Sequence, residues 1–197
     1  MTTSLSVIHL TDTGQVLAAF SRTTDPSGTV AVEDVVGADF LLRGNHFLAA
    51  ENPLADAAQG EWQTHLAVPA SACTVTNLDW DEEVLRRPTS YLLDGGALVT
   101  LSGTLTGVDV SLDATHCKHN PASALGLAEG QQVWALLQRD DGSVRRVASG
   151  AVDENNEIEL PWKVVDGDPA PAPSGSYLAL ICIAGHSPLR LRNIVFP

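Results

Sequence analysis

The sequence of 197 residues predicts an all-β protein, an antiparallel β-sandwich with a few short helical turns. Two patterns carry this prediction. Apolar and polar residues alternate with a period of two along much of the chain, as they do in strands with one wet face. Turns that contain glycine separate these segments at short intervals, as between antiparallel strands. Hydrophobic residues make up 44% of the chain, which is ordinary for a globular protein.

The N-terminal part predicts a β-meander of three strands. Residues 5–12 and 15–22 alternate on either side of a turn at Thr13–Gly14. A second turn is expected at the sequence DPSG, because proline presets its own φ angle and glycine accepts conformations that other residues avoid. Residues 29–36 then predict the third strand.

Further strands are predicted toward the C-terminus. Residues 107–114 alternate valine and leucine with polar residues, which indicates one wet face. Asp141–Gly142 is a strong hairpin signal. The nearly continuous apolar run at residues 176–185 is typical of a central strand that is covered on both faces. Residues 189–196 alternate leucine and arginine and predict a last strand.

Helical signals are short. Residues 79–88 carry acids early, bases late and a stopping proline, which predicts one or two helical turns. Residues 52–59 and 120–130 both begin with Asn-Pro, a pair that favours the start of a helix. No apolar run approaches 18 residues, so the sequence predicts no membrane-spanning helix.

Two segments of the chain are similar at a spacing of 128 residues. Val7–Glu33 and Ala135–Pro161 align without a gap. The positions that they share are Asp12/Asp140, Gly14/Gly142, Val16/Val144, Ser21/Ser149 and Asp25/Asp153. Either two β-meanders use the same turn chemistry, or half of a sandwich is duplicated. We expect one domain over residues 1–197, the alternative being a larger sandwich over 1–128 and a smaller one over 129–197.

Residues 148–185, which overlap the second of these segments, resemble a known group of modules. This stretch reads ASGAVDENNEIELPW and continues to PSGSYLALICIAG. A turn with aspartate, an apolar strand, and then Pro-x-Gly-x-Tyr before a second apolar strand are similar to bacterial immunoglobulin-like and transthyretin-like modules. The resemblance implies an immunoglobulin-like sandwich, a jelly-roll-like one being the other form considered, and it carries no active-site residue.

The net charge of −13 restricts the partners. A field of this sign repels phosphate backbones and anionic headgroups, which argues against nucleic acids and membrane surfaces. The charge is also uneven. Met1–Leu85 holds 12 acidic and two basic residues, whereas Arg86–Pro197 holds 12 acidic and nine basic ones. Proteins, including further copies of this chain, are the expected partners.

Cysteine usage and the first residues bear on localisation. Cys73, Cys117 and Cys182 are an odd and sparse set, which is not a disulfide framework and indicates synthesis in a reducing, cytoplasmic compartment. The first residues lack the basic region and the long apolar stretch of a signal peptide, so none is predicted.

The densest group of reactive side chains lies in the sequence THCKHN. His116, Cys117 and His119 are all metal-ligand types. In a strand, however, only Cys117 and His119 share a face, which is too few for a zinc site. No G-x-S-x-G, phosphate loop or spaced metal motif accompanies them. We predict no catalytic residue and no cofactor, with this segment as a plain surface loop. The alternative is a metal-dependent enzyme centred on His116 and His119.

Two clusters of carboxylates, at residues 79–83 and 153–157, have the alternating spacing of calcium ligands. Val84 and Ile158 stand where a calcium loop needs glycine. The expected roles are therefore the start of a helix and a solvated turn.

The tryptophans offer aromatic surface. Of Trp62, Trp80, Trp134 and Trp162, the pair Trp134 and Trp162 lies at the edges of predicted strands. These two are the candidates for contact with a sugar or a peptide, the alternative being a place in the core or at its rim.

The sequence therefore predicts a non-enzymatic structural or assembly subunit that acts through protein–protein contacts, as in a phage-like or other multi-subunit particle. In the sequence LRLRN, the leucines are expected to be buried while Arg190 and Arg192 face the acidic part of a neighbouring copy. Contact with acids of the same chain is the alternative for these arginines. A carbohydrate- or peptide-binding β-sandwich is the second candidate function.

Overall fold

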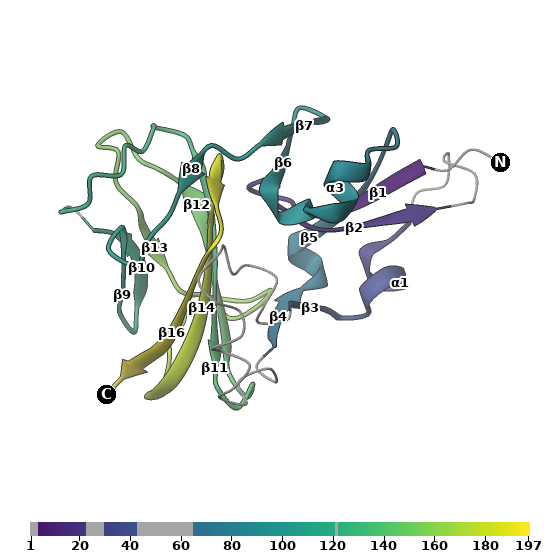
Figure 1. Cartoon of the computed structure of the whole chain (residues 1–197). Helices are drawn as coiled ribbons and strands as arrows, with labels where there is room; N and C mark the ends of the chain where they lie inside the picture. The colour runs from purple at the N-terminus through teal and green to yellow at the C-terminus, as the bar shows by residue number, and fades with distance from the viewer. Residues whose placement is uncertain (1–3, 23–29, 43–64, 121) are drawn as a thin grey trace, which may run out of the picture.

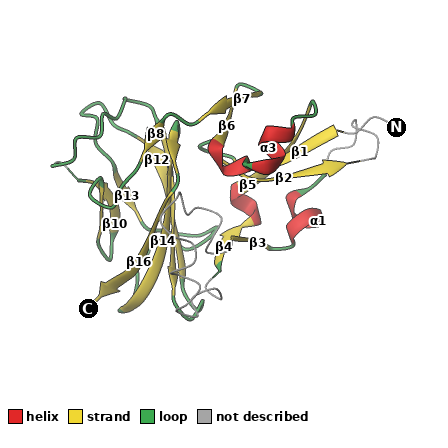
Figure 2. Cartoon of the chain, viewed as in Figure 1, coloured by secondary structure: helices red, strands yellow, loops and turns green. Residues whose placement is uncertain are grey.

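The computed structural model describes residues 4–22, 30–42, 65–120 and 122–197. The predicted fold class is confirmed, since strands hold 52% of the described residues and nearly all paired strands are antiparallel. The α-helices in the described ranges are two five-residue segments, α1 (Val32–Val36) and α3 (Glu82–Arg86) (Figure 2). Neither is long and apolar enough to cross a membrane.

A four-stranded antiparallel sheet lies at the centre of the molecule (Figure 1). Its order is β12-β11-β14-β16, and its strands are β11 (Gln132–Arg139), β12 (Arg145–Ala151), β14 (Gly175–Ile183) and β16 (Leu189–Phe196). Every side chain of β14 from Tyr177 onward is buried. The prediction of a central strand that is covered on both faces is thereby confirmed.

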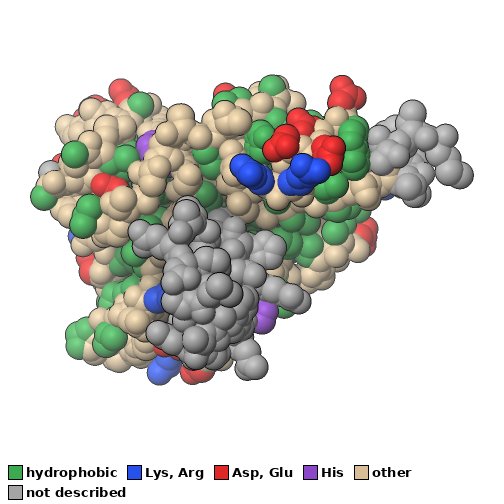
Figure 3. Space-filling view, in the orientation of Figure 1, with side chains coloured by type: hydrophobic (Ala, Val, Ile, Leu, Met, Phe, Trp, Pro, Cys, Tyr) green, Lys and Arg blue, Asp and Glu red, His purple; other side chains and the backbone are tan. Residues whose placement is uncertain are grey.

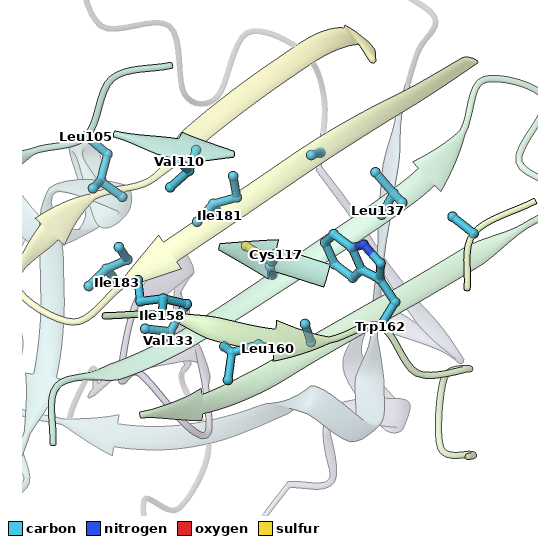
Figure 4. Packing of buried hydrophobic residues seen from close by; sticks show 14 of the residues in the cluster. Leu105, Val110, Cys117, Val133, Leu137, Ile158, Leu160, Trp162, Ile181 and Ile183 are labelled. Carbon is cyan, nitrogen blue, oxygen red and sulfur yellow. The ribbon is translucent and has the colours of Figure 1, made fainter. Parts of the chain in front are cut away.

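One face of the central sheet packs against a second sheet with the order β13-β10-β9. Its strands are β9 (Val110–Leu112), β10 (His116–His119) and β13 (Glu159–Pro161). Val133 and Ile181 of the central sheet meet Cys117, Leu160 and Trp162 from this side (Figure 4). The two sheets thus form a sandwich-like pair of layers around one core.

The opposite face packs against the N-terminal sheet, whose order is β2-β1-β5. Its strands are β1 (Ser4–Leu10), β2 (Val16–Arg22) and β5 (Cys73–Leu78), and the hairpin of β3 (Asp39–Leu42) and β4 (Leu66–Pro69) joins the same core. Ile8 and Leu10 here contact the cluster that contains Trp134 and Leu180. Both this core and the first one therefore combine residues from 1–128 with residues from 129–197.

A third, smaller core covers the outer face of the N-terminal sheet. It contains Leu5, Val7, Val16 and Val84, the last from α3. The hairpin of β6 (Tyr91–Asp94) and β7 (Ala97–Thr100) follows α3 and a short 3-10 turn, η3 (Pro88–Ser90). The remaining pieces are η2 (Ala70–Ala72) and the parallel pair β8 (Gly103–Thr104) and β15 (His186–Ser187). As a result, β1 is buried on both faces.

The two similar segments both fold as a hairpin that begins with a central strand. β1 pairs with β2 on one side and β5 on the other, and β11 pairs with β12 and β14 in the same manner. Gly14 and Gly142 have φ angles of 70° and 73° in the two turns. A Cβ atom at Gly14 would also lie 2.2 Å from the Leu93 carbonyl oxygen, so this position requires glycine.

Three sequence predictions are wrong in whole or in part, and a fourth lies outside the described residues. The strand predicted over residues 107–114 forms only at Val110–Leu112, and Val108 is exposed while Asp109 is buried. Residues 32–36 form α1 instead of a strand, with Glu33 and Asp34 in the first turn and Gly37 at the end. No helix forms within 122–130, because the Asn120 side chain accepts from the Ala122 N–H and stabilises a local turn. The expected helix at 52–59 lies outside the described ranges.

Candidate functional site

The sequence THCKHN forms strand β10, and its cysteine points into a core. Cys117 is 1% exposed, and burial raises the pKa of its thiol to about 12. The thiols of Cys73 and Cys182 are also buried with raised pKa values, that of Cys73 reaching about 12. These side chains act as small apolar groups in the folded chain.

The two histidines of this strand lie in separate surroundings. Nδ1 of His116 is 2.8 Å from Oγ1 of Thr115 and 4.0 Å from a carboxylate oxygen of Asp113. His119 is on the Cys117 face and interacts with Asp109, whose carboxylate accepts a hydrogen bond from Thr106. Within the described ranges, no three His, Cys, Asp or Glu side chains are grouped so as to hold a metal ion.

Both carboxylate clusters have structural roles, and acidic side chains gather over α3 on the face of the molecule in Figure 3. Asp81 accepts hydrogen bonds from the N–H groups of Glu83 and Val84 at 2.8 and 3.3 Å, and thereby caps α3. Asp153 accepts from the N–H groups of Asn155 and Glu157 at 2.9 and 2.8 Å in an exposed turn. The expected helix start and solvated turn are confirmed.

The tryptophans lie at different depths. Trp162 is 1% exposed, and its indole N–H donates to the backbone oxygen of Asp113 at 2.9 Å. Trp134 is 3% exposed and lies on the opposite face of the central sheet, where it also lines a pocket. Trp80 is 47% exposed, and Trp62 lies outside the described residues.

The pocket beside Trp134, here called the Trp134 pocket, has a volume of about 220 Å³. Its floor is the edge of the central sheet, where Ser149 of β12 is paired directly with Trp134 of β11. Five polar side chains surround the opening, namely Thr11, Asp12, Ser71, Ser149 and Asp166. Five apolar residues complete the lining, namely Pro69, Ala72, Trp134, Val147 and Val165. Such a mixture of apolar floor and polar rim is typical of small-molecule sites.

A second and larger hollow lies on the other side of the β1–β2 turn. It has a volume of about 450 Å³ and shares Thr11 and Asp12 with the Trp134 pocket. Turns converge on it from four places in the sequence, at residues 11–14, 92–94, 130–132 and 184–185. Its polar side chains include Asp94 and Gln131, so its lining is mixed as well.

Sequence reasoning identified Trp134 but missed the rest of its pocket. Thr11 and Asp12 belong to a turn, Ser71 to η2 and Asp166 to a loop, so they are far apart along the chain. Each looks like an ordinary surface residue by itself. The pairing of Trp134 with Ser149 could have been found from the hairpin register at Asp141–Gly142, whereas the contacts between sheets have no local signal.

Arg190 and Arg192 belong to β16, which is an edge strand of the central sheet. Leu189 and Leu191 pack against the first core, as the alternation of the sequence predicts. Arg190 is paired with Leu180 and so shares the face that the N-terminal sheet covers. Both arginines are half-buried, and each already interacts within the chain.

The two edges of the central sheet differ. At the β12 edge, Val147 and Lys163 exchange two backbone hydrogen bonds, of 2.9 and 2.8 Å. At the other edge, β16 has one hydrogen-bonded neighbour within the described ranges, which is β14. A β-bulge interrupts β16 at Asn193, whose φ angle is 57°.

No family model, curated protein or solved structure matches this chain.

Proposed function

We propose that this chain is a non-enzymatic assembly subunit whose copies associate through the outer edge of β16. The observation that carries the proposal is the contrast between the two edges of the central sheet. Lys163 pairs with Val147 at the outer edge of β12, whereas β14 is the one strand in the described ranges that pairs with β16, whose Arg190 and Arg192 make further interactions within the chain. An edge of this kind is a template for a strand from another chain.

Exposed apolar side chains flank this edge. Val195 of β16 and Val108 are 70% and 69% exposed, the highest values among the large apolar residues that the structure describes. A Cβ atom at Gly107 would lie 3.3 Å from Cδ2 of Leu191, so the loop that carries Val108 adjoins β16. Burial of these valines by a partner would supply the apolar part of the contact.

The charge distribution favours the acidic N-terminal part of a second copy as the occupant. Basic residues are concentrated after Leu85, and two of them lie on β16. The N-terminal sheet of the next copy also ends in an edge strand, β5, which is followed by Asp79 and Asp81. Contact between two different edges produces rings or open stacks instead of a two-fold dimer. The bulge at Asn193 restricts pairing to short stretches, so side chains would select the partner.

Sedimentation analysis of Val195→Asp tests the proposal. The wild-type protein is expected to associate as its concentration rises, and salt should weaken the association because it screens charges beyond about 8–10 Å. An aspartate at position 195 would place a strongly hydrated group at the apolar contact and a negative charge opposite the acidic part of the partner. We expect the association constant to fall by about tenfold or more, equivalent to about 1.4 kcal/mol.

Val164→Asp is the matched control. It makes the same chemical change at a side chain that is 42% exposed and belongs to the opposite side of the sheet, where Lys163 borders β12. This variant should associate as the wild type does. A wild-type protein that stays monomeric at every concentration, or an association that Val195→Asp leaves unchanged, would contradict the proposal. Reversal of the charge at Arg190 is a less specific test, because that side chain is half-buried and its substitution would also affect folding.

A further inference from the structure

We infer that the Trp134 pocket binds a neutral, polyhydroxylated ligand of the size of one sugar ring. The inference does not depend on assembly through β16, which lies at the other edge of the sheet. It rests on the position, the polar groups and the charge of the pocket, which are taken in turn.

The pocket lies between two layers that are fixed relative to each other. Its floor belongs to the central sheet, and one wall is formed by the β1–β2 turn and by η2 of the N-terminal layer. Ser71 of η2 donates a hydrogen bond of 2.8 Å to Asp166, and this contact joins the wall to the loop after β13. The core between the two layers continues beneath, through Trp134 and Leu136. The cavity is therefore largely formed before any ligand arrives, which lowers the entropy cost of binding.

The pocket presents hydrogen-bonding groups that the protein itself does not use. Within the described ranges, no hydrogen bond or ion pair engages the Asp12 carboxylate, the Ser149 hydroxyl or the Trp134 indole N–H. Asp166 accepts the Ser71 bond through one oxygen, which leaves its second oxygen as an acceptor. Two carboxylates that accept and a hydroxyl and an indole that donate match the alternating donors and acceptors of a polyol.

The remaining surface of the pocket is apolar and suits the C–H face of such a ring. Trp134, Val147 and Val165 lie beside the polar groups. Trp134 is almost wholly buried, so its ring is fixed by packing and would contact a ligand at its edge instead of offering an open stacking platform. The volume of about 220 Å³ limits the occupant to a single ring or the end unit of a longer chain.

Charge selects among ligands of this size. Asp12 and Asp166 line the pocket in a chain whose net charge is −13, and no Lys or Arg side chain is part of the described lining. Phosphorylated and carboxylated sugars are therefore disfavoured by like-charge repulsion. A neutral sugar can accept from Trp134 and Ser149 and donate to both carboxylates.

The experiment uses the full chain and the following probes: glucose, galactose, mannose and N-acetylglucosamine as neutral sugars, and glucuronate as the anionic arm. Binding is followed by the NMR shift of the Trp134 indole N–H, with the Trp162 indole N–H as an internal reference, because the latter is bonded to Asp113. At least one neutral sugar should saturate the Trp134 signal and leave the Trp162 signal in place. Its Kd should rise about tenfold in Asp12→Asn and also rise in Ser149→Ala, since a hydrogen bond to a charged group contributes about that factor.

Asp94→Asn is the matched control, because it removes the same charge from the neighbouring hollow. Its Kd should equal that of the wild type. Asp12 and Ser149 are exposed, so these variants are expected to fold normally. The inference is overturned if no neutral sugar shifts the Trp134 signal, if Asp12→Asn and Asp94→Asn weaken binding equally, or if glucuronate binds more tightly than every neutral sugar.

Discussion

At the scale of single residues, Leu180 gives the most direct test of the layered core. Its side chain is 0% exposed and lies in the core between the central and N-terminal sheets. Truncation to alanine should leave a cavity that packed sheets on both sides cannot close. We expect Leu180→Ala to lower the free energy of unfolding by about 2–5 kcal/mol in urea titrations.

Val195→Ala is the comparison, since this valine is 70% exposed in the isolated chain. At low protein concentration its cost should stay within about 0.5 kcal/mol. A loss below that figure for Leu180→Ala would place β14 at the surface and refute the layered core.

The thiols give a second test at this scale. Burial raises the pKa of Cys73 and of Cys117 to about 12, and also raises that of Cys182. Because the thiolate is the reactive form, the native protein should react with a thiol reagent only as fast as it opens, and all three cysteines should react at once in denaturant. Rapid modification of any one in the native state would show that its burial is wrong.

At the scale of elements, Gln138 connects the central sheet to the β3–β4 hairpin. Its side-chain amide accepts from the Ala67 N–H at 2.8 Å and donates to the His65 oxygen at 2.7 Å, so it imitates one rung of a β-ladder. Arg145 supports the same hairpin through Asp39. Gln138→Ala should cost about 1–3 kcal/mol, because it leaves half-buried backbone groups unpaired.

Thermal unfolding of Gln138→Ala beside Gln132→Ala measures this effect. Gln132 lies on the same strand but is exposed. The two variants should differ by several degrees in melting temperature. Equal melting temperatures would mean that the two hydrogen bonds of the Gln138 side chain contribute nothing to stability.

The elements also show where sequence reasoning succeeds. The hairpins at Gly14 and Gly142 and the limits of β16 were predicted because their signals are local: a positive φ angle or an alternation over a few residues. The helix α1 was missed because its valines also fit an alternating pattern, and only Val32 is buried. The outer face of β1 is covered by α3 and β6–β7, and such tertiary cover has no local signal.

The candidate sites were likewise predictable where their signals are local and missed where they depend on tertiary contacts. Arg190 and Arg192 were placed on one strand correctly, and the leucines between them were expected inside. The N-terminal layer partly covers the face of β16 that holds Arg190. This cover depends on how two sheets stack, and the alternating sequence pattern does not contain that information. The pocket at Trp134 likewise needs the approach of Asp12 and Asp166 from distant segments.

At the scale of the whole molecule, stability should fall in acid in two windows. Burial lowers the pKa of His9 from 6.5. Below about pH 6.5, His9 therefore becomes protonated in the unfolded chain while it stays neutral in the folded chain, and the free energy of unfolding falls. Burial would raise the pKa of Asp113, but hydrogen bonds from Thr115, His116 and Lys118 outweigh it and lower the value. The stability from Asp113 is present above about pH 4 and is lost as the pH falls through the lowered value.

The comparison of His9→Gln with the wild type isolates the first window. Urea titrations between about pH 7 and pH 5 should show stability falling by up to about 1.4 kcal/mol per pH unit more in the wild type than in the variant. Identical slopes for the two proteins would contradict the burial of His9.

The association of copies through β16 is tested most directly by hydrogen–deuterium exchange at two protein concentrations. The β16 amides that point away from β14 should exchange quickly in dilute protein and become protected as the concentration rises, because a strand of a second copy then accepts from them. The Val147 amide of β12 should show no such dependence, since it already donates to the Lys163 carbonyl. Exchange at β16 that is the same at both concentrations, in a protein that does associate, would contradict the account.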